Sequence, residues 1–292
     1  IYICCKIKGG NYHYLGYVNK NIVDNTRLVK MIGQEGDNAS NDIRRIFDQQ
    51  YLPISDLIEV YEEEQEEQIK IINQNYVPLH VHSEFSIGDG FGTAQYIADC
   101  LYKKGFKACA ITDHGTLAGV WKFQKALLEK NIKPIIGCEL YIKIPETEKR
   151  LHNVVLVKNK IGWKNLLKIQ SLAVRENFYY KPIVPIKILF KYSEGLIVTG
   201  GCVDSPINAS LLAGDEELAE KYLIKYKEIW KEDFYGEIQP HIAIRNQEIM
   251  PKALQLYKKH NIKSIFTTDS HYCNKEDKEF HEAIKAIGLK KT

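Results

Sequence analysis

The sequence has no apolar run near the ~20 residues that a helix needs to cross a membrane, and no signal peptide at its start. It also lacks a strong excess of either charge, because 40 Lys and Arg stand against 37 Asp and Glu, for a formal net charge of +3. This balance argues against binding nucleic acid through bulk positive charge alone and leaves a local basic groove open. We therefore expect a protein without membrane contact.

The cysteines do not form a disulfide framework, because their number, seven, is odd and their spacing shows no paired pattern. We expect reduced thiols in a cytoplasmic protein, some of them buried as small apolar residues and one or two serving as ligands. The seven are Cys4, Cys5, Cys100, Cys109, Cys138, Cys202 and Cys273.

The first 75 residues differ in pattern from the rest. Two short β-like runs, IYICCKI and YHYLGYV, flank the turn KGGN. A predicted helix (IRRIFDQQ), a strand (ISDLIEVY) and an acidic helical run (EEEQEEQIKIINQN) follow, and the acidic run is typical of a solvated helix face. These residues, 1–75, predict a small α+β module. The chain starts with Ile, so we expect it to be a piece of a longer protein.

From Tyr76 to the last residue, predicted strands and helices alternate, which indicates an α/β domain over 76–292 with a mainly parallel sheet, open or closed into a barrel. Strands are predicted at VPLHVHS, KACAITDH, KPIIGCELYI, HNVVLVKN, GLIVTGG, YGEIQPH and SIFTTDSH. In the predicted helix TAQYIADCLYKKG, Thr93 is the expected N-cap and Gly105 the expected C′ residue.

Possible metal ligands gather where these strands end. In parallel α/β folds the carboxyl ends of the strands form the functional rim. His152 is the exception, because it opens its strand. The residues at or just after strand ends are His80, His82, Asp89, His114, Glu139, Cys202, Asp269 and His271. Imidazole, carboxylate and thiolate are the ligands that Zn²⁺, Mn²⁺ or Fe²⁺ take in proteins.

Each motif has an ordinary alternative when it stands alone. The pairs His80/His82 and Asp269/His271 each point to one side of an extended strand, but such pairs are commonly incidental. Cys202 could be a small buried apolar residue. Chance placement of all nine candidates at strand ends, with His152 at the start of its strand, is much less expected, so the set together indicates a metal site.

The sequence resembles a known family at ten colinear landmarks. They are LHVHSEFSIGDG, AITDHG, IKPIIGCELYI, HNVVLVKN, WKNLLKI, FYYKP, KYSEGLIVTGGC, LLAGD, FYGEIQPH and TTDSHYCNKEDKEFHEAI. They are similar to the polymerase-and-histidinol-phosphatase (PHP) domain at the N-terminus of the bacterial replicative DNA polymerase III alpha subunit. The resemblance implies a distorted seven-stranded, TIM-like (β/α) barrel, in the cytoplasm of a bacterial cell or a phage-infected host.

The resemblance also implies the ligand set and the activity. Nine ligands would hold two to three divalent ions (Zn, Mn or Fe), and they fall here on His80, His82, Asp89, His114, Glu139, His152, Cys202, Asp269 and His271. Family members with the full set are associated with metal-dependent 3′→5′ exonuclease proofreading. A metal-bound water would be the nucleophile for phosphodiester hydrolysis, and no separate protein base is assigned.

Two more residues are candidates for roles around the metals. Asp113 could be a turn residue or could orient a ligand histidine. His241 could contact phosphate or orient a ligand, or it could be an ordinary loop histidine.

The first 75 residues faintly resemble a GIY-YIG nuclease module. The candidate residues are Tyr14 and Gly16 of the second triplet, Arg44 or Arg45 of a helix, and Glu66 or Glu67 as the metal-binding acid. The first triplet has no Gly, so a degenerate structural or DNA-contacting appendage is an equal alternative.

Three functions remain open from the sequence. The first is a 3′→5′ exonuclease within a polymerase, whose partners would be the 3′ end of a DNA primer, polymerase domains beyond the C-terminus and other replisome subunits. The second is a non-catalytic PHP scaffold that binds a proofreading subunit. The third is a phosphatase for a small phosphate monoester. The catalytic carboxylates of a polymerase palm are absent, so this piece cannot itself polymerise DNA.

Overall fold

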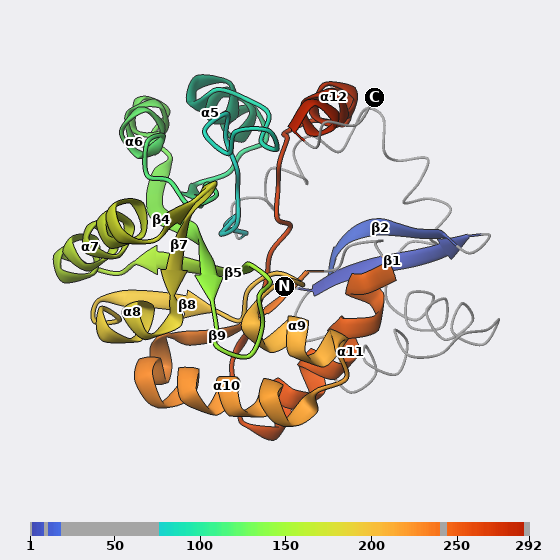
Figure 1. The fold of residues 1–292 in the computed structure, drawn as a ribbon. Coiled ribbons are helices and arrows are strands. Elements are labelled where there is room, and N and C mark those ends of the chain that lie inside the picture. Colours follow the sequence, from blue (N-terminus) through green and yellow to red (C-terminus); the bar gives the residue numbers. More distant parts are fainter. Residues whose placement is uncertain (1, 9–10, 19–75, 240–243, 289–292) are drawn as a thin grey trace.

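The computed structural model describes residues 2–8, 11–18, 76–239 and 244–288. Among them, the largest assembly is one curled mixed sheet with helices around its outside (Figure 1). The strand order is β10 (Ser264–Phe266), β9 (Phe234–Ile238), β8 (Leu196–Thr199), β5 (Leu151–Val157), β4 (Lys133–Lys143), β7 (Lys181–Pro185) and β6 (Phe178–Tyr179), with β3 (Ala108–Ile111) paired to the first half of β4.

The helices follow the strands along the chain, as the alternating pattern predicted. They are α5 (Ala94–Lys103), α6 (Val120–Glu129), α7 (Lys160–Glu176), α8 (Ile186–Lys191), α9 (Pro206–Leu212), α10 (Glu216–Trp230), α11 (Ile244–Lys259) and α12 (Lys278–Gly288), with short 3₁₀ turns at Lys231–Asp233 and Lys275–Asp277. No helix among the described residues is both long and apolar enough to span a membrane.

The ends of α5 follow the capping rules read from the sequence. The side chain of Thr93 accepts a hydrogen bond from the backbone N–H of Tyr96, which satisfies one of the free donors of the first turn. Lys104 is the C-cap, and Gly105 follows with φ 82°, a left-handed conformation that suits glycine. Both predictions for this helix are confirmed.

The sheet is less parallel than the sequence predicted. β5 runs antiparallel to both of its neighbours, β4 and β8, whereas β3 and β7 pair with β4 in parallel, and β9 pairs in parallel with β8 and β10. A connection of only seven residues joins β4 to β5, too short for the helical crossover that parallel neighbours need. The reversal of β5 brings the start of this strand to the rim where β4 ends.

The segment 78–82 closes the sheet but is not a regular strand, contrary to the prediction for VPLHVHS. On one side it pairs with β3, through bonds from the N–H of Ala110 to the Pro78 carbonyl and from the N–H of Thr112 to the Val81 carbonyl. On the other side Val81 bridges Ser270, just after β10. Seven segments therefore form a ring: 78–82, β3, β4, β5, β8, β9 and β10. This confirms a distorted seven-stranded barrel.

The N-terminal residues described are two strands, β1 (Tyr2–Lys8) and β2 (Asn11–Val18), paired antiparallel. Tyr14 and Gly16 lie on β2, and the register sets Tyr14 opposite Cys5. The other candidates of the nuclease-like module lie outside the described residues: Arg44, Arg45, Glu66 and Glu67. The α+β module at 1–75 and its GIY-YIG likeness stay predictions.

Candidate metal centre

Histidines and carboxylates converge at one rim of the barrel because the segments that carry them end or begin there. The loop from 78 to 89 carries His80, His82 and Asp89, and the loop after β10 carries Asp269 and His271. Hydrogen bonds from the His82 N–H to the Ser270 carbonyl, and from the Ser270 N–H to the His80 carbonyl, fix these two loops side by side. Each H-x-H or D-x-H pair therefore faces the other.

His80 and His82 both point their Nε2 atoms at the same two carboxylates. The Nε2 atoms lie 3.4 Å from Oε2 of Glu139 in both cases, and 3.3 and 3.2 Å from Oδ1 of Asp269. Both residues are 1% exposed, so they lie at the buried end of the site, and we call them the floor histidines.

The carboxylate of Glu139 contacts most of the histidines of the site. Its Oε2 lies 2.7 Å from Nδ1 of His114, and its Oε1 lies 3.2 Å from Nδ1 of His152. His152 opens β5, and the antiparallel pairing sets it opposite Tyr141, two residues after Glu139. The residue that broke the strand-end pattern in the sequence thus lies at the same rim as the others.

Asp89 lies at the outer side of the site. Its Oδ2 lies 3.3 Å from Nε2 of His114 and 3.3 Å from Nε2 of His271. The ring of His82 lies between these two imidazoles, 4.2 Å from each ring centre. The side chain of Asp89 is 28% exposed, so the site opens to solvent on this side.

Many of the inward-facing atoms are buried and make no well-aligned hydrogen bond among the described residues, although several face one another as close nitrogen–oxygen pairs. They are His80 Nε2, His82 Nε2, Asp89 Oδ1, His114 Nδ1, Glu139 Oε2, Asp269 Oδ1 and His271 Nε2. Buried polar atoms are nearly always bonded, so a cluster of unpartnered ones fits a bound cation. Three overlapping groups could each hold an ion, with ligand atoms within 4.8 Å of one another: His80, His82 and Asp269; His82, His114 and His271; His114, Glu139 and His152.

Glu237, which the sequence reading did not single out, holds the floor histidine. It is buried on β9 and accepts a hydrogen bond from Nδ1 of His80 at 2.8 Å. Thr199, Thr267 and Gln239 also donate to its carboxylate. A carboxylate on Nδ1 fixes the tautomer that leaves Nε2 free for a metal. A buried acid inside an otherwise apolar strand, FYGEI, was the signal in the sequence.

Asp113 supports the second floor histidine through a serine. Ser86 Oγ donates to Asp113 Oδ1 at 2.8 Å and accepts from Nδ1 of His82 at 2.9 Å and from the N–H of His114 at 3.1 Å. Asp113 also accepts from the backbone and hydroxyl of Ser83. Asp113 therefore contacts the site through Ser86 rather than directly.

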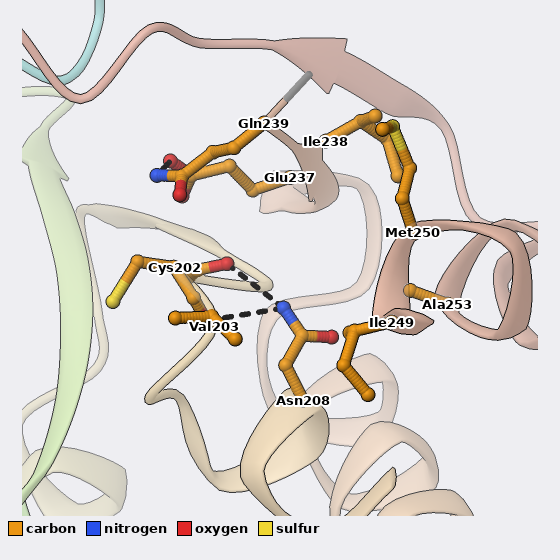
Figure 2. A pocket seen from close by; sticks show the side chains of 10 residues that line it. Cys202, Val203, Asn208, Glu237, Ile238, Gln239, Ile249, Met250 and Ala253 are labelled. Carbon is orange, nitrogen blue, oxygen red and sulfur yellow. Dashed lines mark hydrogen bonds between the residues drawn. The ribbon is translucent and has the colours of Figure 1, made fainter. Parts of the chain in front are cut away.

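Cys202 lies in the loop after β8, and its thiol is buried (Figure 2). Asn208 donates from Nδ2 to the carbonyls of Cys202 and Gly201, 3.1 Å each, and the sulfur points away from Asn208. Burial raises the pKa of this thiol, and the charges of Glu139 and Asp269 raise it further. The thiol stays protonated beside these acids unless a cation offsets their charge.

The buried acids and imidazoles of the site shift one another's pKa. Burial alone would raise the pKa of Glu139, but the imidazoles of His80, His152 and His114 hold it well below its usual range. Burial disfavours charge on His114, yet Glu139 and Asp89 raise its pKa to about 9. Burial and the neighbouring imidazoles of His271 and His114 lower the pKa of His82 to about 3.

The backbone at Asp269 is strained. Its φ is 47°, in the left-handed region that non-glycine residues seldom adopt. Such strain persists only where surrounding contacts fix it, and it concentrates at functional sites. Here it turns the Asp269 carboxylate toward His80 and His82.

Helix α12 adds two basic side chains that the sequence reading missed. Nε2 of His281 lies 3.5 Å from Oδ1 of Asp89, and Nζ of Lys285 lies 3.9 Å from the same oxygen. Their spacing of four residues puts both on one helix face, which was the available signal. The other predicted histidine, His241, lies outside the described residues, and its role stays a prediction.

The comparisons with known proteins show the family of this chain. The model of the PHP domain family matches residues 78–241. The DNA polymerase III subunit alpha of Aquifex aeolicus is 36% identical over 236 residues, covering 76% of this chain and 20% of that protein. The subunit of Borreliella burgdorferi is 37% identical over 225 residues, covering 73% and 19%.

A solved two-domain protein from Bacteroides vulgatus, described as containing a predicted PHP-like metal-dependent phosphoesterase, is 17% identical with a TM-score of 0.42, over 71% of this chain and 55% of that one. The chain spans about a fifth of the length of the curated relatives named above. The family model covers more than half of the 292 residues, and this chain therefore belongs to the PHP domain family.

Proposed function

We propose that this chain is the PHP domain of a DNA polymerase III alpha-type protein and that its metal centre removes nucleotides from the 3′ end of DNA. The observation that carries the proposal is the convergence of buried nitrogen and oxygen atoms, without well-aligned hydrogen bonds, on one rim that opens at Asp89. Identity to polymerase alpha subunits supports DNA as the substrate.

The proposed ligands are the nine predicted from the sequence. Eight of them lie within 3.6 Å of another member through a nitrogen and a carboxylate oxygen: His80, His82, Asp89, His114, Glu139, His152, Asp269 and His271. Cys202 is the ninth, buried and under the influence of Glu139 and Asp269. Two to three divalent ions match this number of donors, and Zn, Mn and Fe suit their mixture of nitrogen, oxygen and sulfur.

Divalent ions in such a site would acidify water and neutralise charge on a phosphodiester. The protein's own residues would orient the ligand histidines and hold the phosphate group of the substrate. Glu237 and Ser86 fix the two floor histidines from behind, so that both Nε2 atoms face the site. Lys285 lies at the open side, where its ammonium can attract a phosphate group. Burial and the neighbouring His271 lower the pKa of His281, so this imidazole would hold Asp89 rather than supply charge.

The part of this chain that matches covers only about a fifth of the relatives' length, so the partners are part of the proposal. Further polymerase domains would follow this chain, and the 3′ end of a primer would reach the rim from them. Other replisome subunits would bind the assembled polymerase in the cytoplasm. A scaffold that only binds a proofreading subunit is disfavoured by the intact site, and a monoester phosphatase by the identity to polymerase subunits.

Elemental analysis of the purified protein tests the metals. We expect two to three transition-metal ions per chain. Fewer than two would count heavily against catalysis and in favour of the scaffold.

Digestion of a 3′-labelled primer tests the substrate. We expect shortening of the primer by the wild-type chain and none by His82→Ala. His260→Ala is the matched control, because His260 is a partly buried histidine that pairs with Glu220. Cleavage of p-nitrophenyl phosphate without digestion of the primer would replace the exonuclease with a phosphatase.

A further inference from the structure

Three successive aromatic side chains are exposed on the β6–β7 hairpin. Phe178, Tyr179 and Tyr180 are 60, 71 and 78% exposed. The hairpin is tight, because Tyr179 pairs with Lys181 across it and Tyr180 alone turns the chain, with φ 58°. A non-glycine residue in this conformation is costly, so the hairpin presents its rings at the expense of backbone strain. Large apolar side chains held in water in this way mark a binding surface.

The hairpin lies beside the metal centre. β7 pairs in parallel with the last residues of β4, with Ile183 opposite Tyr141. The ring of Tyr141 stacks on that of His114, with centres 5.7 Å apart, and meets that of His152 at 5.2 Å. Pro182 packs so closely on Gly115, next to His114, that a methyl group on this glycine would lie 3.0 Å from the proline ring. One layer of side chains therefore separates the hairpin from the proposed ligands.

Cations border the aromatic rings on the side of the centre. The guanidinium of Arg150 and the ammonium of Lys181 lie over the Tyr141 ring, 5.9 and 5.6 Å from its centre. Arg150 also lines an open groove of about 610 Å³ with Tyr179 and Tyr180. Two acids, Glu148 and Glu176, line the groove too. Glu148 pairs with Lys143 at 2.5 Å, so part of this negative charge is neutralised.

Exposed rings next to cations are the chemistry that binds single-stranded nucleic acid. Bases stack on aromatic faces whatever their sequence, while Arg and Lys contact the phosphates. A single strand also suits a site that must accept a 3′ end, because paired bases hide the faces that a ring could stack on. Of the occupants that an apolar surface could take, unpaired DNA is the one that the rings, the cations and the neighbouring metal centre favour together.

We propose that the rings of Phe178, Tyr179 and Tyr180 stack on unpaired bases near the 3′ end of DNA, and that Arg150 and Lys181 hold the phosphates that lead to the metal centre. The proposal rests on the proposed function and names the form of DNA that the site takes. A frayed or mismatched primer end offers such bases, whereas a paired end does not.

Binding of a 5′-fluorescein dT12 strand, followed by anisotropy with a chelator present, tests the hairpin without any catalysis. We expect Tyr179→Ala and Tyr180→Gly each to weaken binding about five- to tenfold, the low end of what one stacked base contributes. Glycine at position 180 removes the ring and accepts the positive φ, so the hairpin keeps its shape. Trp121→Ala is the matched control, since Trp121 is 75% exposed on α6, and it should leave binding unchanged.

The salt dependence of the same binding tests the cations. Arg150→Gln and Lys181→Gln should each reduce the slope of log K against log salt by about 0.7, the value for one phosphate contact on a single strand. Unchanged affinity in both tyrosine variants, or no binding of dT12 by the wild-type chain, would overturn the proposal. In that case another protein would be the remaining candidate partner for the exposed rings of the hairpin.

Hydrolysis separates a failure here from a failure of the proposed function. With metal added, Tyr179→Ala should hydrolyse bis(p-nitrophenyl) phosphate at the wild-type rate but show a raised KM for dT12. If the wild-type chain hydrolyses neither substrate, the proposed function fails. The anisotropy measurement still shows whether the hairpin binds single-stranded DNA. An equal loss of both activities in Tyr179→Ala would show damage to the centre and overturn the stacking role.

Discussion

Nδ1 of His152 lies 3.2 Å from Oε1 of Glu139, although one residue opens its strand and the other lies within the preceding one. The contact exists because β5 reverses direction against β4, so that the start of one strand meets the end of the other. A parallel β5 would carry His152 to the opposite end of the barrel. The reversal of a single strand therefore completes the proposed ligand set.

Replacing Glu237 by Gln should weaken metal binding about 10- to 100-fold. The carboxylate accepts the Nδ1 hydrogen of His80, and a neutral amide holds this imidazole less firmly and makes it a poorer donor to a metal. Titration calorimetry with Zn²⁺ or Mn²⁺ measures the change. Glu232→Gln is the matched control, because Glu232 is 87% exposed and pairs only with Lys263 in the described structure. Equal affinities of the two variants would contradict the prediction.

Ser86→Ala should lower metal affinity about tenfold or more through His82. The hydroxyl links Asp113 to Nδ1 of His82, and without it the imidazole loses the partner that fixes its tautomer. Competition with a metallochromic dye gives the affinity. Ser171→Ala should have no effect, since among the described residues the Ser171 hydroxyl bonds only its own helix, at the Leu167 carbonyl. A loss of stability with unchanged affinity would assign Ser86 a structural role alone.

The metal-free protein should lose stability as pH rises from about 6.5 to about 9. Burial opposes charge on His114, but Glu139 and Asp89 raise its folded pKa to about 9, above the ordinary value near 6.5. A raised histidine pKa stabilises the folded state fully below the unfolded pKa, and this contribution is lost as pH passes the folded one. Glu139 and Asp89 stay ionised throughout this window.

Thermal unfolding in a chelator at several pH values measures this slope, which should be smaller in His114→Asn. With metal added the direction should reverse, because ions bind deprotonated imidazoles and bind more tightly as pH rises. The same falling stability with and without metal would argue against His114 as a ligand.

Gly200→Ala should lower the free energy of unfolding by about 1–3 kcal/mol. A methyl group there would overlap the hydroxyl of the fully buried Tyr257, just before the loop that carries Cys202. Tyr257→Phe removes that oxygen, so the cost of Gly200→Ala should fall by at least about 0.5 kcal/mol in this background. The cost of Gly214→Ala, at a position with nothing within 4 Å, should be the same in both backgrounds. Urea unfolding gives all these values.

The residue types of the site could be predicted from the sequence because they recur at strand ends. The H-x-H and D-x-H pairs, Glu139 late in its strand and the capped helix at Thr93 are local patterns, and local geometry fixes them. The family resemblance added the assignment of all nine ligands, which stays a prediction.

Tertiary structure alone decided the strand directions and the residues that orient the proposed ligands. Local periodicity does not encode whether a strand pairs parallel or antiparallel, so the reversal of β5 was not foreseen. Nor does it show that Glu237, 157 residues away in sequence, lies behind His80. His281 and Lys285 reach Asp89 only because α12 packs across the open rim. The sequence by itself determined which atoms could bind a metal, and long-range packing decided which of them meet, because contacts between distant segments depend on the whole chain.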